Sequence, residues 1–469
     1  MLDLLITGGE VVSSATVLRA DVGVKDGKIV LVASPGSIDQ EALRTIDATG
    51  KYVLPGGVDS HVHFNLPLSA VMTAQSADPG TVAAAFGGTT TFIDFAKQNG
   101  ESSLLGAIAD KRQEIAADHP HVDYALHAMI TGRSTSVIMD EMPDAYAEGI
   151  TSFKMFTAFS ADDDPVTGGS LYSDDGRIWG VMTRAAKLGA VVMVHCEDDS
   201  LINYNIHCLY REGKQHASNI HLARTGLTEE AAINRMLLLS RRSGAPLYVC
   251  HVTSSAGVEA VAEAQGKREP VFGEALHHNL SFTSDMYARE DGPLYHTYPG
   301  LKSHDDRAAL WSALREGILH SLSSDDFTLP KADKLAGRNI DNVTGGHNGI
   351  ETRMGVFYSE GVQGRKVSIN QFVNVTSEGP AKIFGLFPRK GIILPGSDAD
   401  IVLFDPNLSH EIRQADLHAD CDYSVWDGWK CQGFPVTTIL RGQVLVEDRE
   451  WVGPKGTGQF IAAGSPMEP

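Results

Sequence analysis

Eight short apolar segments alternate with helical stretches through the middle of this 469-residue chain. A helix after each strand brings the chain back to the start of the next one, so such repeats form parallel sheets. Eight repeats over about 330 residues fit a (β/α)8 TIM-like barrel better than an open sheet, and they assign the chain to the α/β class. The predicted strands are Val58–Phe64, Thr89–Phe95, Val122–Ile130, Thr151–Phe159, Ala190–Glu197, Pro246–Thr253, Pro270–Leu276 and His320–Asp326.

The two ends of the chain follow a different pattern, in which short apolar runs are separated by turns. Asp26-Gly27 lies between two such runs and predicts a β-hairpin, because its turn needs positive φ. The C-terminal part repeats this style at Ala399–Phe404 and Val436–Leu440. Both ends together predict one small β-sandwich beside the barrel. The predicted division is residues 1–53 and 391–452 for the sandwich, 54–390 for the barrel, and 453–469 for a flexible tail or an arm onto a neighbouring subunit.

Composition limits the partners of the chain. Lys and Arg number 39 and Asp and Glu number 59, and the formal net charge of −20 repels phosphate backbones, so nucleic-acid binding is not expected. A membrane-spanning helix needs about 20 consecutive apolar residues, and apolar runs such as Val191–Val194 are far shorter. The five cysteines include no Cys-x-x-Cys pair, and the N-terminus has no basic signal region. These features predict reduced thiols and a cytoplasmic location.

Histidines end three of the predicted strands. His61 and His63 are two residues apart, so strand alternation sends both side chains to one face, where they can bind one metal ion. A single His-x-His can also simply finish a strand, and a lone His at a strand end is usually a core residue. His195 and His251, however, end two further strands. In a barrel these ends meet on the face where catalytic groups gather, and imidazole is a common ligand of zinc and related metals.

Lys154 and Asp325 add two charged groups to the same set of strand ends. Lys154 is the only charged residue in the segment from Phe153 to Phe159. An ammonium buried there without a partner is costly, so Lys154 is expected to be modified or to have a lowered pKa, unless its side chain extends to solvent. Asp325 ends the eighth predicted strand, although a Ser-Asp pair can also start a turn or cap a helix.

In chain order these residues form Asp-x-His-x-His, a buried lysine, two histidines and an aspartate. This order resembles the amidohydrolase superfamily, and more closely its cyclic amidases: dihydropyrimidinase, hydantoinase and allantoinase. The resemblance covers essentially the whole chain, including the split terminal sandwich. Its other matching segments are Gly87–Thr91, Ser152–Phe156, His251–Ser255, Gly273-Glu274, Asn348–Glu351 and Gly396–Asp400.

The resemblance implies two divalent metal ions, with Zn²⁺ the expected metal, and a carbamate formed by CO₂ on Lys154. The implied metal ligands are His61, His63, Lys154, His195, His251 and Asp325. Asp325 is also implied as the catalytic group that takes a proton from the attacking water and passes it to the leaving nitrogen. Asn348 and the backbone near Tyr298 match positions that hold the ring amide in the family.

Phe159 departs from the family's pattern. Hydantoinases usually carry Tyr five residues after the carboxylated lysine, and its hydroxyl stabilises the developing oxyanion. Losing one such donor costs about 100- to 1,000-fold in rate. Tyr298 and Tyr172 are candidates to supply the hydroxyl from another loop. Asp326, where the family commonly has His, and His277-His278 depart as well, so we expect an intact metal centre beside an altered substrate pocket.

We therefore expect a hydrolase that opens the ring amide of a dihydropyrimidine, a hydantoin or a related imide. One alternative is an allantoinase-like enzyme or another amide or carbamate hydrolase with a remodelled pocket. A second, of a different class, is a non-catalytic interaction protein related to dihydropyrimidinase, although all six ligand positions are filled. The expected partner is a small-molecule cyclic amide, and the resemblance implies a homo-oligomer, either a tetramer or a dimer.

Overall fold

A computed structural model describes residues 1–469 apart from 68–72, 99, 101, 133–135 and 161–170. Its centre is an eight-stranded parallel sheet in which the strands follow one another in chain order. A parallel bridge between Val62 and Asp326 joins the last strand to the first and closes the barrel. All eight predicted segments are strands, which confirms the predicted barrel. These strands are β8 (Gly57–Val62), β9 (Thr89–Lys97), β10 (Asp123–Met129), β11 (Ser152–Phe156), β12 (Val191–His195), β13 (Leu247–Val249), β14 (Val271–Leu276) and β15 (Ser321–Ser323).

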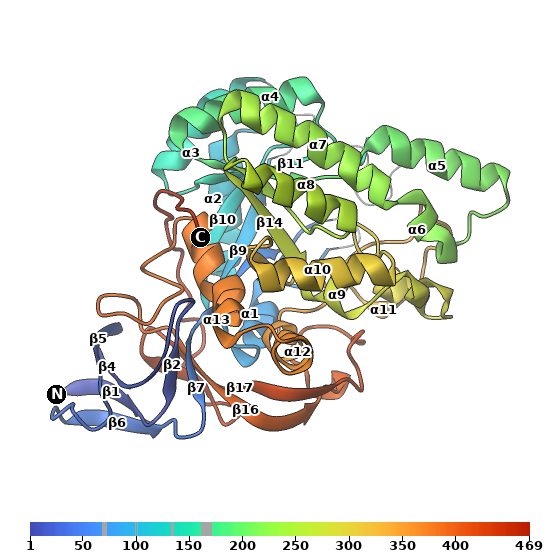
Figure 1. Ribbon diagram of the computed structural model, residues 1–469. Helices are drawn as coiled ribbons and strands as arrows, with labels where there is room; N and C mark the ends of the chain where they lie inside the picture. The colour runs from blue at the N-terminus through green and yellow to red at the C-terminus, as the bar shows by residue number, and fades with distance from the viewer. Residues whose placement is uncertain (68–72, 99, 101, 133–135, 161–170) are drawn as a thin grey trace.

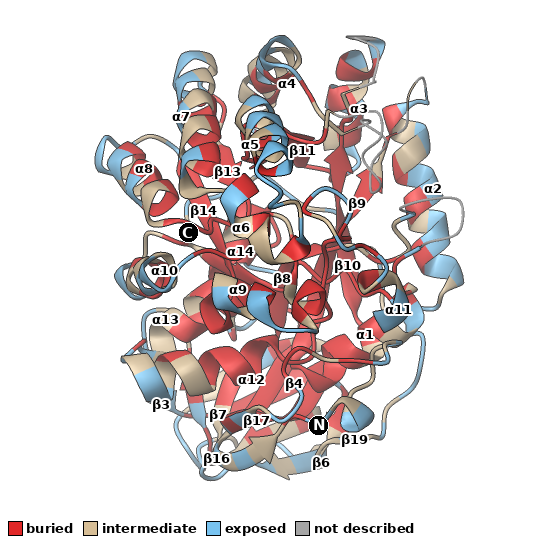
Figure 2. Ribbon diagram, turned by 90° about the vertical axis from the view of Figure 1, so that its right-hand side faces the viewer, coloured by how far each residue is buried: buried red, intermediate tan, exposed pale blue. Residues whose placement is uncertain are grey.

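Helices surround the barrel, and most of the long ones have a buried side and an exposed side (Figures 1 and 2). The helix α7 ends at Gly244, whose φ of 79° is the left-handed conformation that glycine adopts without a Cβ clash. The longer helices are α1 (Ala77–Phe86), α2 (Leu104–Ala117), α4 (Asp175–Leu188), α5 (Asp199–Arg211), α7 (Gly226–Ser243), α8 (Ser255–Gly266) and α10 (His304–Glu316). The shorter ones are α3 (Met142–Ala147), α6 (Ile220–Ala223), α9 (His277–Ser281), α11 (Lys331–Lys334), α12 (Arg353–Phe357), α13 (Ile369–Val373) and α14 (Gly379–Ile383). Among the residues that the model covers, no helix has the length and apolar character needed to cross a bilayer.

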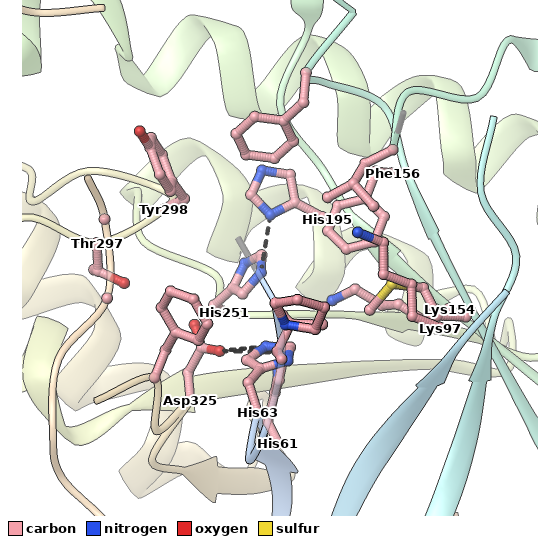
Figure 3. A pocket seen from close by; sticks show the side chains of 18 residues that line it. His61, His63, Lys97, Lys154, Phe156, His195, His251, Thr297, Tyr298 and Asp325 are labelled. Atoms are coloured by element: carbon pink, nitrogen blue, oxygen red, sulfur yellow. Dashed lines mark hydrogen bonds and ion pairs between the residues drawn. The ribbon is translucent and has the colours of Figure 1, made fainter. Parts of the chain in front are cut away.

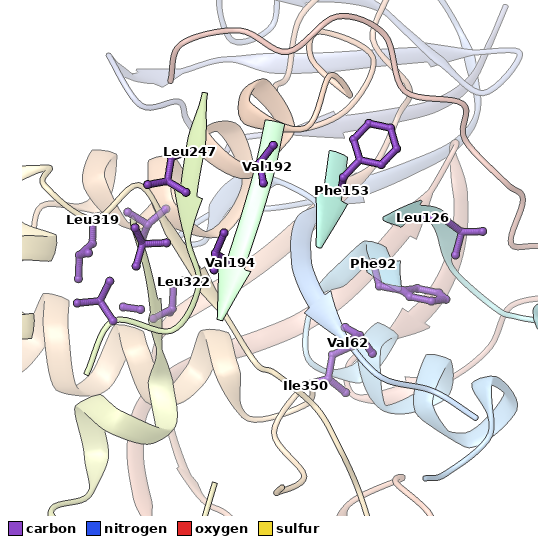
Figure 4. Close-up of a cluster of buried hydrophobic side chains, with 14 of the residues drawn as sticks. Val62, Phe92, Leu126, Phe153, Val192, Val194, Leu247, Leu319, Leu322 and Ile350 are labelled. Carbon is purple, nitrogen blue, oxygen red and sulfur yellow. The ribbon is translucent and has the colours of Figure 1, made fainter. Parts of the chain in front are cut away.

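Alternation along the strands produces two separate hydrophobic layers. In β11 and β12, Phe153 and Val192 pack outward beneath the helices (Figure 4), whereas Phe156 and Met193 belong to the cluster inside the barrel. Lys154 lies between Phe153 and Met155, which are both fully buried. Side chains alternate along β11, so Phe153 and Met155 face the helices and Lys154 faces the inside of the barrel.

Both ends of the chain build the second unit, as predicted. The strand β7 (Tyr52–Pro55) pairs antiparallel with β16 (Ile401–Glu411), with Val53 opposite Leu403. The predicted hairpin is present between β4 and β5, where Asp26 and Gly27 have φ of 49° and 75°. A four-stranded sheet contains β1 (Leu2–Thr7), β4 (Asp21–Lys25), β5 (Lys28–Ala33) and β6 (Ala42–Asp47). A seven-stranded sheet contains β7, β16, β2 (Glu10–Val12), β3 (Val17–Arg19), β17 (Lys430–Leu440), β18 (Gln443–Glu447) and β19 (Glu450–Trp451).

The C-terminal segment lies along its own barrel, which differs from the expected tail or neighbour-binding arm. The backbone at 459–461 pairs with β10 through both polar backbone groups of Tyr124. Further along, Ala463 donates to the carbonyl of Gly149 and Met467 to that of Lys382. These bonds occupy backbone groups that a free tail would leave to water. The other proposed domain boundaries stay predictions.

Candidate metal centre

The predicted site residues meet in one cavity at the carboxyl ends of the barrel strands (Figure 3). His61 lies in β8, Lys154 in β11 and His195 at the end of β12, while His251 and Asp325 follow β13 and β15. This is the face of such barrels on which active sites are built. The structure therefore brings together all six residues predicted to bind metal: His61, His63, Lys154, His195, His251 and Asp325.

Two groups of facing ligand atoms are present in this cavity. In the first, Asp325 Oδ1 lies 3.1 Å from His63 Nε2 and 3.4 Å from His61 Nε2. In the second, His195 Nδ1 lies 3.1 Å from His251 Nε2. The rings of His61 and His251 are 5.5 Å apart, so the two groups are neighbours.

Lys154 lies beside these groups in apolar surroundings. Its side chain is buried, and its ammonium contacts the rings of Phe95 and Phe156 at 5.5 and 5.1 Å. Its hydrogen-bond partner is the Cys250 thiol, at 3.0 Å. Within the part of the chain that the model covers, Lys154 forms no ion pair. The alternative in which this side chain extends to solvent does not hold, because Lys154 is buried.

Two buried glutamates hold the histidines from behind. Glu274 accepts from His61 Nδ1 at 2.9 Å and from the backbone of His251 at 2.8 Å. Glu197 is bound to His195 Nε2 at 2.9 Å and to Arg224 at 2.5 Å. Such carboxylates fix the orientation of a ligand imidazole and raise its basicity. Sequence reasoning assigned neither role, although Glu197 is two residues after His195 and so on the same side of the strand.

Electrostatics at the site favours the protonation states that bind cations. Burial lowers the pKa of His63 to about 4 and also lowers the pKa of His195 and of His251. These imidazoles are therefore neutral near pH 7. Burial opposes ionisation of Asp325, but the neighbouring His61 and His63 outweigh it and hold the pKa of that carboxyl well below its usual range. Neutral imidazole and ionised carboxylate are the forms that coordinate metals.

The backbone is strained at three residues of the cavity. His251, Asp325 and Phe159 have φ of 35°, 51° and 74°, in the left-handed region that residues with a Cβ rarely adopt. Such conformations cost about 1–3 kcal/mol each and persist where the surrounding structure enforces them, typically at functional sites. Here the strain turns two of the candidate ligands into the cavity.

The ligand set fits two divalent cations. The nitrogens of His195 and His251 face each other, and the outer Nδ1 atoms of His63 and His251 are buried without a hydrogen-bond partner. His61, His63 and Asp325 have ligand atoms close enough to share one ion. Imidazole and carboxylate are ligands of zinc and its first-row neighbours. The donor chemistry and the close approach of these ligand atoms both support metal binding here.

The residues predicted to contact substrate fall in different places. Phe159 and Tyr298 line the cavity, with ring centroids 5.2 Å apart. The Tyr298 hydroxyl donates to the carbonyl of Val343 at 2.9 Å and points away from the histidines (Figure 3). Asn348 does not line this cavity, because its amide donates to the carbonyl of Tyr423 at 2.9 Å. Its role as a substrate contact stays a prediction, as does that of Phe159.

Tyr172, the second candidate to supply the hydroxyl, and the departures other than Phe159 do not line the cavity. Tyr172 lines a separate hollow beside α4 and does not bring its hydroxyl to the metal ligands. Asp326 accepts from the backbone of Gly349 and Ile350 and so holds that loop. His277 stacks on Trp426 with ring centroids 4.4 Å apart. Sequence reasoning missed several cavity residues, which are Leu66, Pro67, Lys97, Met129, Phe156, Leu171, Thr297, Phe327, Gly345 and Gly346.

A closed α/β barrel with histidines, a lysine and an aspartate at its strand ends defines a metal-dependent barrel enzyme as the class. The model of the Amidohydrolase family matches residues 52–445. The chain is 36% identical to D-hydantoinase of Geobacillus stearothermophilus, across 97% of this chain and 96% of the relative. It is 37% identical to D-hydantoinase of Ralstonia pickettii, across 98% of each. The crystal structure of dihydropyrimidinase from Brevibacillus agri NCHU1002 superposes with a TM-score of 0.91 at 34% identity, covering 99% of both chains.

This chain belongs to the amidohydrolase family, within its hydantoinase-like branch.

Proposed function

We propose that this protein hydrolyses the C–N bond of a ring amide in a dihydropyrimidine, hydantoin or related imide. The observation that carries the proposal is the convergence of six ligand side chains on one cavity, where His195 Nδ1 and His251 Nε2 lie 3.1 Å apart. The family membership and the names of the full-length relatives support the same reaction. They favour a dihydropyrimidine or hydantoin substrate over allantoin, and an enzyme over a non-catalytic interaction protein.

Two divalent cations, proposed as Zn²⁺, would polarise the amide carbonyl and make a water acidic enough to attack it near neutral pH. We assign His61, His63 and Asp325 to one ion and His195 and His251 to the other. We assign Lys154 as the bridge, after CO₂ adds to its Nζ and a proton is lost. The missing ion pair at Lys154 supports this assignment, since the carbamate would replace a buried, uncompensated ammonium with an anionic ligand.

Asp325 is the proposed proton carrier of the reaction. Its Oδ1 faces both imidazoles of the first ligand group, and the lowered pKa keeps the carboxyl ionised, the form that can accept a proton. It would take the proton of the attacking water and deliver it to the ring nitrogen as the C–N bond breaks. Glu274 and Glu197 would keep His61 and His195 oriented during this transfer.

The finer assignments belong to the same proposal. A cytoplasmic location is supported by five cysteines without a disulfide. A homo-oligomer, tetramer or dimer, is supported by large apolar side chains that are exposed on four consecutive helices, α4 to α7. These side chains are Trp179, Tyr204, Tyr210, Leu222, Leu227 and Leu238. Sedimentation of the purified protein tests the oligomer, and a monomer at micromolar concentration contradicts it.

The decisive experiment combines elemental mass spectrometry with hydrolysis assays on one sample. The assays use dihydrouracil, substituted hydantoins, allantoin and simple imides. We expect about two metal ions per chain and ring opening of at least one dihydropyrimidine, hydantoin or imide. Hydrolysis of allantoin alone would favour the allantoinase-like alternative. A protein that takes up no metal when zinc and bicarbonate are added would contradict the proposal and favour the non-catalytic relatives.

A further inference from the structure

A second lysine, Lys97, lies on the wall of the same cavity. It is the last residue of β9, and the register pairs it with Met129 of β10, which is itself paired with Lys154 of β11. All three residues line the cavity (Figure 3). Neighbouring strands are about 4.8 Å apart, so the two lysines occupy one layer of the barrel, roughly 10 Å from each other.

The proposed metal ligands leave this part of the wall unused. They come from β8, β11 and β12 and from the residues that follow β8, β13 and β15, whereas β9 and β10 supply none. Lys97 therefore lies beside the ligand set and not within it. Its neighbours on the cavity wall include the apolar side chains of Met129, Phe156 and Leu66. A ring bound at the ligands would extend a substituent toward such a wall.

The fully buried Lys334 and Lys390 have partners that the half-buried Lys97 lacks. Lys334 donates to the carbonyls of His296 and Thr344, and Lys390 contacts three carboxylates. Within the described ranges, Lys97 has neither a hydrogen-bond partner nor an ion pair. Among the described lining residues the only carboxylate is Asp325, which already contacts His61 and His63. Burial lowers the pKa of Lys97, with no anion to offset it.

We propose that Lys97 binds a carboxylate on the ring substituent of the substrate, so that this enzyme prefers anionic cyclic amides. This inference rests on the proposed function and names its substrate class. A partly buried ammonium in an apolar wall is costly without an anion and is satisfied by one that arrives with the substrate. A single ammonium matches the single charge of a carboxylate, and the net positive charge of a metal-loaded cavity would draw such a substrate in.

The test compares two substituents of nearly equal size, one charged and one neutral. The substrates are 5-(2-carboxyethyl)hydantoin and its amide, 5-(2-carbamoylethyl)hydantoin, with the metal-loaded protein. We expect wild type to favour the carboxylate by about 10- to 100-fold in kcat/KM, the range of a hydrogen bond to a charged group. Lys97→Met should lose this preference, whereas Lys97→Arg should keep most of it. Lys187→Met removes an exposed lysine of α4 and is the matched control.

The outcomes separate this inference from the proposed function. If Lys97→Met lowers kcat/KM for both hydantoins by the same factor, Lys97 acts on the reacting amide and the inference is overturned. Equal rates for the two hydantoins in wild type overturn it as well. If wild type hydrolyses neither, the proposed function fails, and calorimetric titration of both compounds still measures the affinity ratio. A ratio of about 10 or more that disappears in Lys97→Met and in Lys97→Gln supports the carboxylate site, and equal affinities overturn it.

Discussion

Buried lysines and aspartates occur at both ends of the barrel. At one end the lysine is paired with carboxylates, and at the other end it is not. At the end where the strands begin, the Lys390 ammonium lies 2.6 Å from carboxylate oxygens of Asp123 and Asp400 and 2.9 Å from Asp398. Arg441 also contacts Asp123. At the other end, the one hydrogen-bond partner of Lys154 among the described residues is the Cys250 thiol, and the imidazoles of His195 and His251 contact each other at 3.1 Å.

Proximity of possible ligands does not by itself identify a cation site. Asp123, Asp398 and Asp400 lie close enough to hold a metal ion, but the ammonium of Lys390 already occupies their centre. This cluster joins β10 to the segment that leads into β16, so it fastens the barrel to the sandwich. Buried charges that are fully paired stabilise a fold, whereas charges left uncompensated mark the place where a ligand binds.

Lys154→Ala has the largest expected effect at the catalytic end of the barrel. The substitution removes the proposed bridge between the two ions, so we expect loss of tight metal binding and a fall in kcat/KM of about 1,000-fold or more, or at least about 4 kcal/mol. Elemental analysis and hydantoin hydrolysis measure the two effects. A short carboxylic acid in the assay should restore part of the activity. Two bound metals with full turnover in this variant would show that the carbamate bridge is wrong.

Lys390→Met tests the opposite end of the barrel. It leaves three carboxylates around an apolar side chain, so we expect a loss of about 3–5 kcal/mol in the free energy of unfolding. Denaturant titration of the metal-free protein measures this loss, and Lys154→Ala serves as the comparison. Lys154→Ala should lose less stability, because it removes an ammonium that has no carboxylate partner. An equal loss in the two variants would refute the proposed difference between the two ends.

The acid dependence of stability gives a smaller effect at the same cluster. Burial raises the pKa of Asp398, but Lys390 and Lys28 outweigh it and lower that pKa to about 2. A lowered pKa means that Asp398 stabilises the fold above its unfolded pKa of about 3.9 and that the contribution is lost as pH falls through 2. Wild type should therefore exceed Asp398→Asn by about 2 kcal/mol at pH 7, and the gap should close toward pH 2. A gap that is constant between pH 7 and pH 3 would contradict this assignment.

The sequence predicts the barrel and the ligand set because both depend on local patterns. Strand alternation and strand ends are readable from neighbouring residues, and they place His61, His195 and Asp325 correctly on one face. Lys97 carries the same signal as Lys154, a charge in an apolar run. It was missed because the strand predicted to end at Phe95 continues to Lys97.

What the sequence could not predict depends on distant partners. The orientation of the Asn348 side-chain amide is set by its hydrogen bond to the carbonyl of Tyr423, which is 75 residues away in the chain. The position of the Tyr298 hydroxyl is likewise set by Val343, 45 residues away. No local pattern around Asn348 or Tyr298 carries this information, so a family motif placed both near the substrate without fixing where their polar atoms point.

Phe159→Tyr has the smallest expected effect and tests the substrate pocket at the catalytic end of the barrel. Phe159 packs on His195 and Tyr298, at ring distances of 5.0 and 5.2 Å. A hydroxyl added here would lie in the cavity beside the ligands, so we expect hydantoin turnover to rise by about 10-fold, or about 1.4 kcal/mol. Tyr298→Phe is the control, since its hydroxyl is committed to Val343 and its removal should leave kcat within about twofold. No gain from the first substitution, with a large loss from the second, would show that Tyr298 has taken over the role of the missing tyrosine.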